Sequence, residues 1–528
     1  MHHALEIDEI LQTILQYFTL HDDDYSARHR IWKLRICRRT LAYLARTCKA
    51  LSNSALDTLW ERQSSLMPVL KLFPTFQTVG KGQYDFVAPI EPEHWQRFLS
   101  YSRRIQTFSF SADGRLLPAV YERVFRASDH PILFPALQRM IWSRNCPIDE
   151  GALLAFVSPS LRIADIQSFG VRKFISQDPT NSEDRNVLDA LLHSLSELSL
   201  QLEDLKIGVQ LTPTAERIIP TLHSIQALDL SMAGSWRYVD SFYALGRMQN
   251  LTELHISMLT LHMEDDVPPG LFKSLRTLYV WGAPATVGSV LRVVASNQLR
   301  VLQVKAGYSY PLEEWRECLA SLPPRLADSL IEFRLECMRG LHSLSDTAGH
   351  IMCVAAPMMS CPNLEKVAFD LEGPLHASDA DVRQMVAAWE KLREFRLWFH
   401  KSGEGPTLQS LVSCADLCSD LCELELSVDA RTALQSPPAQ IRPSLTRLAF
   451  LGNAKITVGQ GETVGKYIHH LFPNLRDFDV YAWAAEENET WVTAKKNIPT
   501  LSAMHNESGY RSREASPSPS EDKSSFRT

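Results

Sequence analysis

A short apolar pattern, apolar-x-x-apolar-x-apolar, recurs along most of this chain. Leu251-x-x-Leu254-x-Ile256 is a clear copy, and fourteen copies follow one another at spacings of 23 to 41 residues. The copies begin at Ile105, Leu137, Leu161, Leu202, Ile225, Leu251, Leu275, Leu299, Leu330, Leu364, Leu392, Leu421, Leu445 and Leu475. Recurrence of one short unit predicts a solenoid, in which each unit packs on its neighbours.

Each copy predicts a short strand, because its second and third apolar positions are two residues apart and so point to one side. In the copy at Leu251, the residues Glu253, His255 and Ser257 would point to the other side. Stretches between copies often carry helical spacing, most clearly at 381–392. A strand followed by a helix, repeated side by side, predicts an α/β solenoid. Its curved parallel sheet would be covered on the outside by helices of uneven length.

The first residues carry a different pattern and predict a small helical domain over 1–62. Apolar residues at helical spacing predict an amphipathic helix over 8–19. The polar segment 21–30 is expected to be a loop, and two further helical pieces follow, the second over 51–60. So small a unit has a marginal core and gains stability by docking on other parts.

The remaining sequence divides by composition. Residues 63–100 hold several prolines and glycines and are expected to be a linker. Residues 101–500 carry the repeats. Residues 501–528 are Ser-rich with few large apolar side chains, so we expect a disordered tail.

The overall charge narrows the classes of partner. The formal net charge is -7 with a pI near 6.2, which does not suggest a nucleic-acid binder. We find no polybasic run indicating a membrane surface and no apolar stretch of spanning length, so no membrane partner is expected. The N-terminus lacks the pattern of a signal peptide, and ten scattered cysteines fit a reducing compartment. The expected location is the cytoplasm, the nucleus or both.

No motif predicts catalysis, a cofactor or a metal site. Residues 461–467 superficially resemble a phosphate-binding loop but fail on glycine spacing and have Tyr467 where Ser or Thr is needed, so we expect a polar loop before a helix. Cys414, Cys418 and Cys422 are four residues apart, but buried thiols explain them better than zinc. We therefore expect that the protein is not an enzyme.

The outward strand positions would line the concave face of the solenoid and are the candidate binding surface. Aromatic and arginine side chains are the usual anchors of protein interfaces. The candidate target-binding residues are Tyr279, Trp281, Arg334, Arg396, Trp398 and Glu425. Packing of these side chains on a neighbouring loop or tail remains the alternative, because a shift of one residue in register reverses the two faces of a strand.

Two stretches of the chain resemble an F-box domain of the kind common in fungal proteins. They are MHHALEIDEILQTILQYF and TLAYLARTCKALSNSALDTLWERQSSLMPVLKLFP. The order Leu-Ala-x-Thr-Cys-Lys-Ala-Leu followed by Ala-Leu-x-x-Leu-Trp is the more specific part. The repeats resemble the irregular leucine-rich repeats that follow such a domain. Together the resemblances cover nearly the whole chain and imply a repeat horseshoe preceded by a small all-α F-box domain.

The resemblance implies the substrate-recognition subunit of an SCF-type cullin–RING ubiquitin ligase. The F-box would dock on the Skp-type adaptor, and through it on a cullin, while the concave face would bind an unknown target protein. The implied adaptor-facing residues are Leu5, Ile7, Ile10, Leu11, Ile14, Leu44, Leu51, Leu56 and Trp60. Some of these must fill the domain's own core, and the sequence does not separate the two sets.

One residue at the start of the first helix departs from the usual F-box pattern, and it leaves an alternative function open. Asp8 stands just before the first helix, where F-boxes commonly have proline. Aspartate also suits a helix N-terminus, so the helix is still expected while adaptor affinity could be lower. The alternative is a non-catalytic repeat scaffold that does not engage a cullin.

Overall fold

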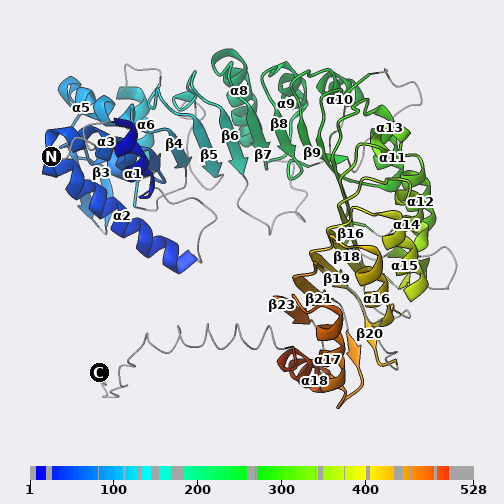
Figure 1. The fold of residues 1–528 in the computed structure, drawn as a ribbon. Coiled ribbons are helices and arrows are strands. Elements are labelled where there is room, and N and C mark those ends of the chain that lie inside the picture. The colour runs from blue at the N-terminus through cyan, green and yellow to red at the C-terminus, as the bar shows by residue number, and fades with distance from the viewer. Residues whose placement is uncertain are drawn as a thin grey trace, which may run out of the picture. The chain divides into compact units, whose positions relative to one another are not determined.

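The computed structural model divides the chain into two compact units, Met1–Leu261 and His262–Thr528. Each unit contains a parallel sheet with helices on one face, which is the α/β solenoid that the repeats predicted (Figure 1). The residues that the structure describes are 8–18, 27–80, 82–110, 115–127, 132–143, 154–167, 182–234, 236, 238–258, 268, 270–308, 310–338, 341–342, 349–373, 375–399, 405–432, 444–451, 454–480 and 485–498. The expected disordered tail, 501–528, lies outside them.

The first unit begins with three helices, α1 (Asp8–Gln16), α2 (Ala27–Thr47) and α3 (Lys49–Trp60). The small core of this helical module consists of Leu11, Leu15 and Leu41, each at most 3% exposed. Half-buried residues complete it: Phe18, Leu44, Leu51 and Leu59. The expected loop over 21–30 is wrong at its end, because α2 already begins at Ala27.

The expected linker over 63–100 is wrong, because this stretch is folded. It contains α4 (Met67–Leu70), a hairpin of β2 (Phe76–Gly80) and β3 (Gln83–Phe86), and α5 (Pro92–Ser102). Four buried aromatic rings hold it together at centroid distances of 5.1–5.7 Å: Phe73, Phe86, Trp95 and Phe98. Its prolines and glycines start helices and turn the hairpin, where a fixed φ or a positive φ is needed.

The helical module joins the first repeats without a linker. Directly after α3, β1 (Arg62–Gln63) pairs in parallel with β4 (Thr107–Phe110). The carbonyl oxygen of Glu61 accepts hydrogen bonds from the backbone N–H groups of Gln106 and Thr107, both at 2.9 Å. Module and sheet therefore share one hydrogen-bonded backbone.

Side chains reinforce this junction. The guanidinium of Arg104 pairs with Asp57 and also donates to the backbone oxygen of Asn53, so it ties α3 to the start of the repeats. The ring of Trp60 packs on that of Tyr101 at 4.9 Å.

The sheet of the first unit has the strand order β1-β4-β5-β6-β7-β8-β9, all parallel. Its other strands are β5 (Arg139–Ser143), β6 (Ile163–Gln167), β7 (Asp204–Ile207), β8 (Ala227–Leu230) and β9 (Glu253–Met258). The helical segments are α6 (Pro118–Ala127), α8 (Ser182–Leu198), α9 (Pro213–Ile218), η3 (Ile219–Thr221) and α10 (Val239–Gly246).

The sheet of the second unit has the order β10-β11-β13-β16-β18-β19-β21-β23, also parallel. Its strands are β10 (Thr277–Gly282), β11 (Val301–Ala306), β13 (Glu332–Cys337), β16 (Lys366–Leu371), β18 (Glu394–Phe399), β19 (Glu423–Leu426), β21 (Arg447–Phe450) and β23 (Asp477–Val480). Three short parallel pairs accompany it: β12 (Tyr310–Pro311) with β14 (Leu341–His342), β15 (Gly349–His350) with β17 (Leu375–His376), and β20 (Asp429–Ala430) with β22 (Lys455–Ile456).

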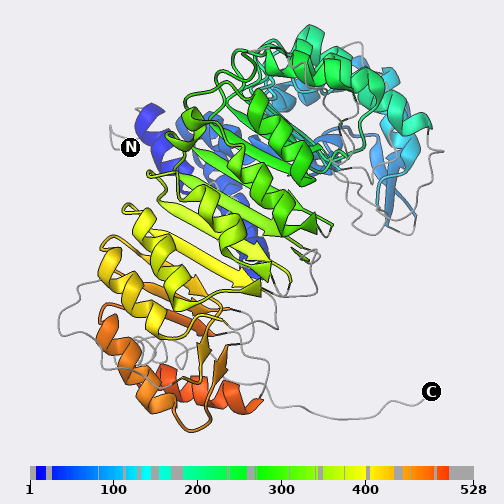
Figure 2. The same cartoon turned by 90° about the vertical axis from the view of Figure 1, so that its right-hand side faces the viewer.

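Figure 2 shows the helices of the second unit side by side in front of its strands. They are α11 (Pro284–Val293), α12 (Leu312–Ala320), α13 (Pro324–Ala327), α14 (Met352–Met358), α15 (Asp379–Ala388), α16 (Gln409–Leu417), α17 (Gly461–Leu471) and α18 (Ala485–Lys496). The expected helix at 381–392 is confirmed up to residue 388 by α15, whose apolar face is buried and whose N-terminus carries a Ser378–Asp381 capping box.

The repeat pattern is confirmed unit by unit. Each of the fourteen apolar starts lies two residues before a strand, from Ile105 before β4 to Leu475 before β23. The helices are uneven, as the spacings predicted. The 41-residue interval after Leu161 contains α8, which has 17 residues, whereas α13 has four.

The glycines of the phosphate-loop-like segment have a packing role. The expected polar loop is wrong, because residues 461–467 form the first part of α17. A Cβ atom at Gly461 would overlap the backbone oxygen of Thr490, and one at Gly465 would overlap that of Ala494. The two glycines, four residues apart, therefore let α17 and α18 pack backbone against backbone.

Candidate protein-interaction surfaces

An apolar stripe on α1 is exposed beside the module's core. Ile10 is 39% exposed, Ile14 42% and Tyr17 83%. Their spacing of four and three residues places them along one side of the helix. Leu11, which the resemblance placed among the adaptor-facing residues, is 3% exposed and packs in the core instead. The structure thus separates interface candidates from core residues on this helix.

The other implied adaptor-facing residues are less exposed. Leu44 and Leu51 pack against the core, and Leu56 is half-buried. Trp60 is half-buried against Tyr101, at the junction with the repeats. Leu5 and Ile7 lie outside the described residues.

A second exposed stripe runs along α2, and sequence reasoning missed it. Trp32 is 64% exposed, Ile36 45% and Tyr43 56%. Arg39 lies between them, donates to the Tyr43 hydroxyl at 3.0 Å and stacks over its ring. The basic run RHRIWKLRICRR could have revealed this helix, but the negative charge of the whole chain conceals it.

The open face of the second unit, meaning the strand face without helices, carries the candidate target-binding residues. Strands β10, β11, β13 and β18 alternate between half-buried and buried residues over their whole length. The half-buried positions include Tyr279, Trp281, Arg334, Arg396, Trp398 and Glu425. The predicted register is therefore confirmed, since a slip of one residue would have buried these side chains in the core.

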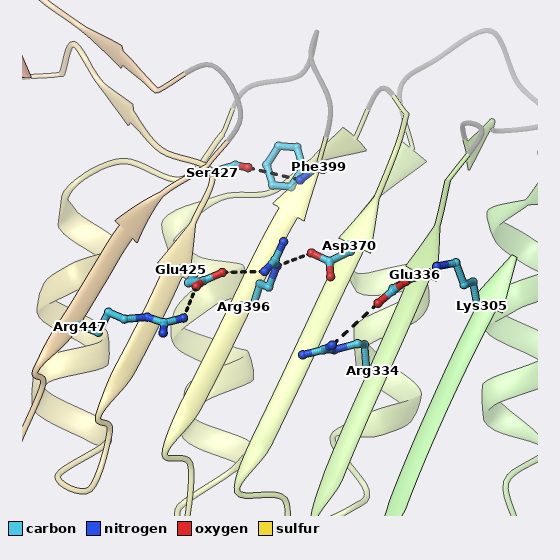
Figure 3. A network of polar contacts seen from close by, with 9 residues as sticks. All are labelled: Lys305, Arg334, Glu336, Asp370, Arg396, Phe399, Glu425, Ser427 and Arg447. Atoms are coloured by element: carbon cyan, nitrogen blue, oxygen red, sulfur yellow. Dashed lines mark hydrogen bonds and ion pairs between the residues drawn. The ribbon is translucent and has the colours of Figure 1, made fainter. Parts of the chain in front are cut away.

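An ion-pair network crosses four strands of this face (Figure 3). Nε of Arg396 lies 2.5 Å from Asp370 on one side, and Nη1 lies 2.9 Å from Glu425 on the other. Glu425 also pairs with Arg447 at 2.8 Å. Two carboxylates thus satisfy Arg396, which leaves it a weaker anchor for a partner than the sequence suggested.

Burial shapes the protonation of this network. Burial raises the pKa of Asp370 above its usual value, and the neighbouring guanidinium of Arg396 opposes that shift only in part. Hydrogen bonding to Glu425 raises the pKa of Arg447. Burial in the sheet therefore disfavours the ionised form of Asp370.

The cations differ in how well they are paired. Lys366 lies 2.5 Å from Glu394, whereas Arg334 approaches Glu336 only to 3.9 Å. Arg334, Ala368 and Arg396 line one pocket on this face, and Ala368 is the register neighbour of both arginines. The small side chain of Ala368 opens space between the two guanidinium groups.

Two tryptophans lie at the ends of one row of residues that are aligned across neighbouring strands. The register aligns Trp281, Lys305, Glu336, Asp370 and Trp398 across five adjacent strands. Adjacent strands are about 4.8 Å apart, so the two tryptophan backbones are separated by about 19 Å. The Trp281 ring also lies over Gly307, where an added Cβ would be 3.1 Å from its Nε1. Packing on a neighbouring loop therefore accounts for part of this side chain.

The open face of the first unit is also charged. Lys206 lies 3.1 Å from Asp229 on the neighbouring strand. Burial raises the pKa of Asp204, and repulsion from Glu253, two strands away, adds to the shift. Lys206, Asp229 and Asp204 were not among the candidate binding residues from the sequence, because no Phe, Tyr or Trp occurs in β7, β8 or β9.

The cysteine prediction holds for two of the three thiols. Cys414 and Cys418 are fully buried, whereas Cys422 lies beyond α16 and is exposed. Burial raises the pKa of the Cys418 thiol to about 11 and also raises that of Cys414. Among the residues that the structure describes, no cluster of His, Cys, Asp or Glu could hold a metal ion. No described helix is both long and apolar enough to cross a membrane.

Comparison with known proteins gave structural likenesses only. No known family's model and no curated protein matches the sequence. An internalin of Listeria monocytogenes is similar over 57% of this chain and 83% of its own, at 11% identity and a TM-score of 0.31. A leucine-rich-repeat protein of Leptospira interrogans is similar over 74% and 81%, at 12% identity and 0.31. The yeast complex of Rad7 and Elc1 is similar over 87% and 94%, at 9% identity and 0.32.

These structures superpose loosely on the chain, so the assignment of its fold rests on the strand ladder itself. The chain is an α/β solenoid of leucine-rich-repeat type.

Proposed function

We propose that this chain is the substrate-recognition subunit of an SCF-type cullin–RING ubiquitin ligase. The helical module docks on a Skp-type adaptor, and the open face of the repeats holds the target protein. The chain supplies no chemistry of its own. It brings the target within reach of the ligase's charged ubiquitin carrier, which is catalysis by proximity.

The observation that carries the proposal is the exposed stripe of Ile10 and Ile14 on α1. These two residues lie in the stretch that resembles an F-box, and both are among the positions that the resemblance makes adaptor-facing. Exposure of an isoleucine side chain to water is unfavourable. Its burial under a partner would stabilise the complex by about 1 kcal/mol or more for each side chain.

The junction between module and repeats also supports this function. β1 extends the sheet directly from α3, and Arg104 ties the two parts together. A module fixed to the first repeats would hold the neighbouring sheet at a defined position relative to the adaptor. A flexible linker would give no such constraint.

The proposed binding to the adaptor is tested by capture of the full-length chain on a purified Skp-type adaptor. Ile10→Asp combined with Ile14→Asp should abolish capture, because two carboxylates would have to be buried in the interface. Gln12→Asp, an exposed substitution on the other side of α1, is the matched control and should be captured like wild type. Equal capture of the double variant and wild type would contradict the proposal. Leu11 is unsuitable for this test, since its substitution would disrupt the core.

The proposed binding of a target protein to the open face is tested by proximity labelling in cells. Trp281→Ala combined with Trp398→Ala should remove specific proteins from the labelled set while adaptor capture is retained. Val492→Ala, an exposed apolar truncation on α18, serves as the control. An unchanged set of labelled proteins would show that the target does not bind at this part of the open face.

A second candidate function is a scaffold that does not recruit a cullin, and Asp8 favours it. This residue begins α1, where proline is common in the family that the sequence resembles. The two functions differ in one measurement. Co-purification of a cullin together with the adaptor supports the ligase, and recovery of the adaptor without a cullin supports the scaffold.

A further inference from the structure

Helix α2 is strongly basic in a chain that is acidic overall. Among its 21 residues are six arginines, one lysine and no aspartate or glutamate, whereas the whole chain has a net charge of -7. A helix with this composition favours an anionic partner, because the charge is concentrated on one element.

The exposed side of α2 is opposite its core contact. Trp32 precedes the core residue Leu41 by nine positions, which is two and a half helical turns. Trp32 therefore lies on the far side of the helix, together with Ile36 and Tyr43. Figure 1 shows α2 along the border of the module, with α1 and α3 to one side of it.

Three exposed arginines form a ridge beside these apolar residues. Arg35, Arg39 and Arg46 are spaced by four and seven residues, so they follow one edge of the same exposed side. Arg38, in contrast, is half-buried and donates to the backbone oxygen of Arg62, so it belongs to the module itself. The outer side of α2 thus presents an apolar ridge and a cationic ridge in parallel.

We propose that the outer side of α2 is a docking surface for an acidic amphipathic segment of another protein. The apolar residues of the partner would pack on Trp32, Ile36 and Tyr43, and its carboxylates would pair with Arg35, Arg39 and Arg46. Trp, Tyr and Arg are the side chains that most often anchor protein interfaces. The Arg39–Tyr43 contact holds two of these groups in place before binding. This surface is separate from the Ile10–Ile14 stripe and does not depend on the ligase function.

The test measures binding of the full-length chain to a fluorescent helical peptide with glutamate and leucine at helical spacing. A lysine–leucine peptide of the same length is the control probe. The reversal variant combines Arg35→Glu, Arg39→Glu and Arg46→Glu. Its matched control combines Arg97→Glu, Arg217→Glu and Arg316→Glu, three exposed helical arginines elsewhere. Circular dichroism and thermal unfolding check that each variant is folded.

We expect the wild type and the control variant to bind the acidic peptide, with affinity that falls as salt is added. The reversal variant should bind at least about tenfold more weakly, because three attractive contacts become repulsive. Trp32→Ala combined with Tyr43→Ala should weaken binding without changing its salt dependence.

Equal binding by the reversal variant and the matched control would overturn the proposal. Phosphatidylserine vesicles and single-stranded poly-uridine RNA are tested alongside. If either binds the wild type more tightly than the peptide does, and the reversal variant loses that binding, the surface serves a membrane or a nucleic acid and the proposal fails.

Discussion

Arg396 reaches sideways from β18 to Glu425 on β19, with 2.9 Å between its Nη1 and the carboxylate. The Glu425 side chain is only 13% exposed, and its second oxygen holds Arg447 on β21. One carboxylate therefore links three neighbouring strands of the open face. These ion pairs are therefore formed within the sheet itself, without a bound partner protein.

Glu425→Ala should lower the free energy of unfolding of the second unit by about 1 kcal/mol, because it removes the carboxylate that the half-exposed Arg396 and the exposed Arg447 share. Thermal and urea unfolding followed by circular dichroism would measure the change. Glu462→Ala removes an exposed ion pair with Lys466 on α17 and should leave the melting temperature unchanged. Equal stability of both variants would show that the network contributes no more than a surface pair.

Asp370→Asn should become more stable relative to wild type as pH rises from about 4 toward neutrality. Burial raises the pKa of Asp370 in the folded protein, so its ionisation opposes folding. The contribution of this carboxyl to stability is present below its unfolded pKa and is lost as pH rises through its folded pKa. Urea unfolding of both proteins across that range measures the difference. The opposite slope would mean that Arg396 outweighs burial.

Gly461→Ala should lower stability by about 2 kcal/mol or more, because the new methyl group would overlap the backbone of α18 and force the two helices apart. Gly288→Ala in α11 is the control, since its nearest neighbour, Oγ of Ser321, would be 3.5 Å away. Removing that glycine should stabilise the protein by up to about 1 kcal/mol. If the two variants melt alike, the glycines of α17 do not set the helix spacing.

Iodoacetamide at pH 8 should alkylate Cys422 in the folded protein and spare Cys414 and Cys418. Cys422 is exposed, whereas burial keeps the other two thiols protonated, with the pKa of Cys418 at about 11. Only the thiolate reacts at an appreciable rate. Peptide mapping by mass spectrometry reports each site, and urea-denatured protein should be labelled at all three. Labelling of Cys418 as fast as Cys422 in the folded chain would contradict the structure at α16.

The sequence alone determined the repeat architecture, because each strand needs only a local pattern of buried positions. The start of every copy located a strand to the residue, and the alternation placed Trp281, Arg334 and Trp398 on the open face. Composition misled at 63–100, where prolines and glycines begin helices and form turns in a folded region. Local propensity does not reveal that Phe73, Trp95 and Phe98 meet in one core.

Tertiary structure decided which of several similar side chains face a partner. Leu11 and Ile10 are adjacent and equally apolar, yet one is buried because α1 turns it toward Leu41 and the other is exposed. It also decided that Arg396 and Glu425 bind each other, since the register that aligns them depends on neighbouring strands 29 residues apart in sequence. Periodicity fixes the face of each element, whereas the contacts across that face arise only when separate elements pack.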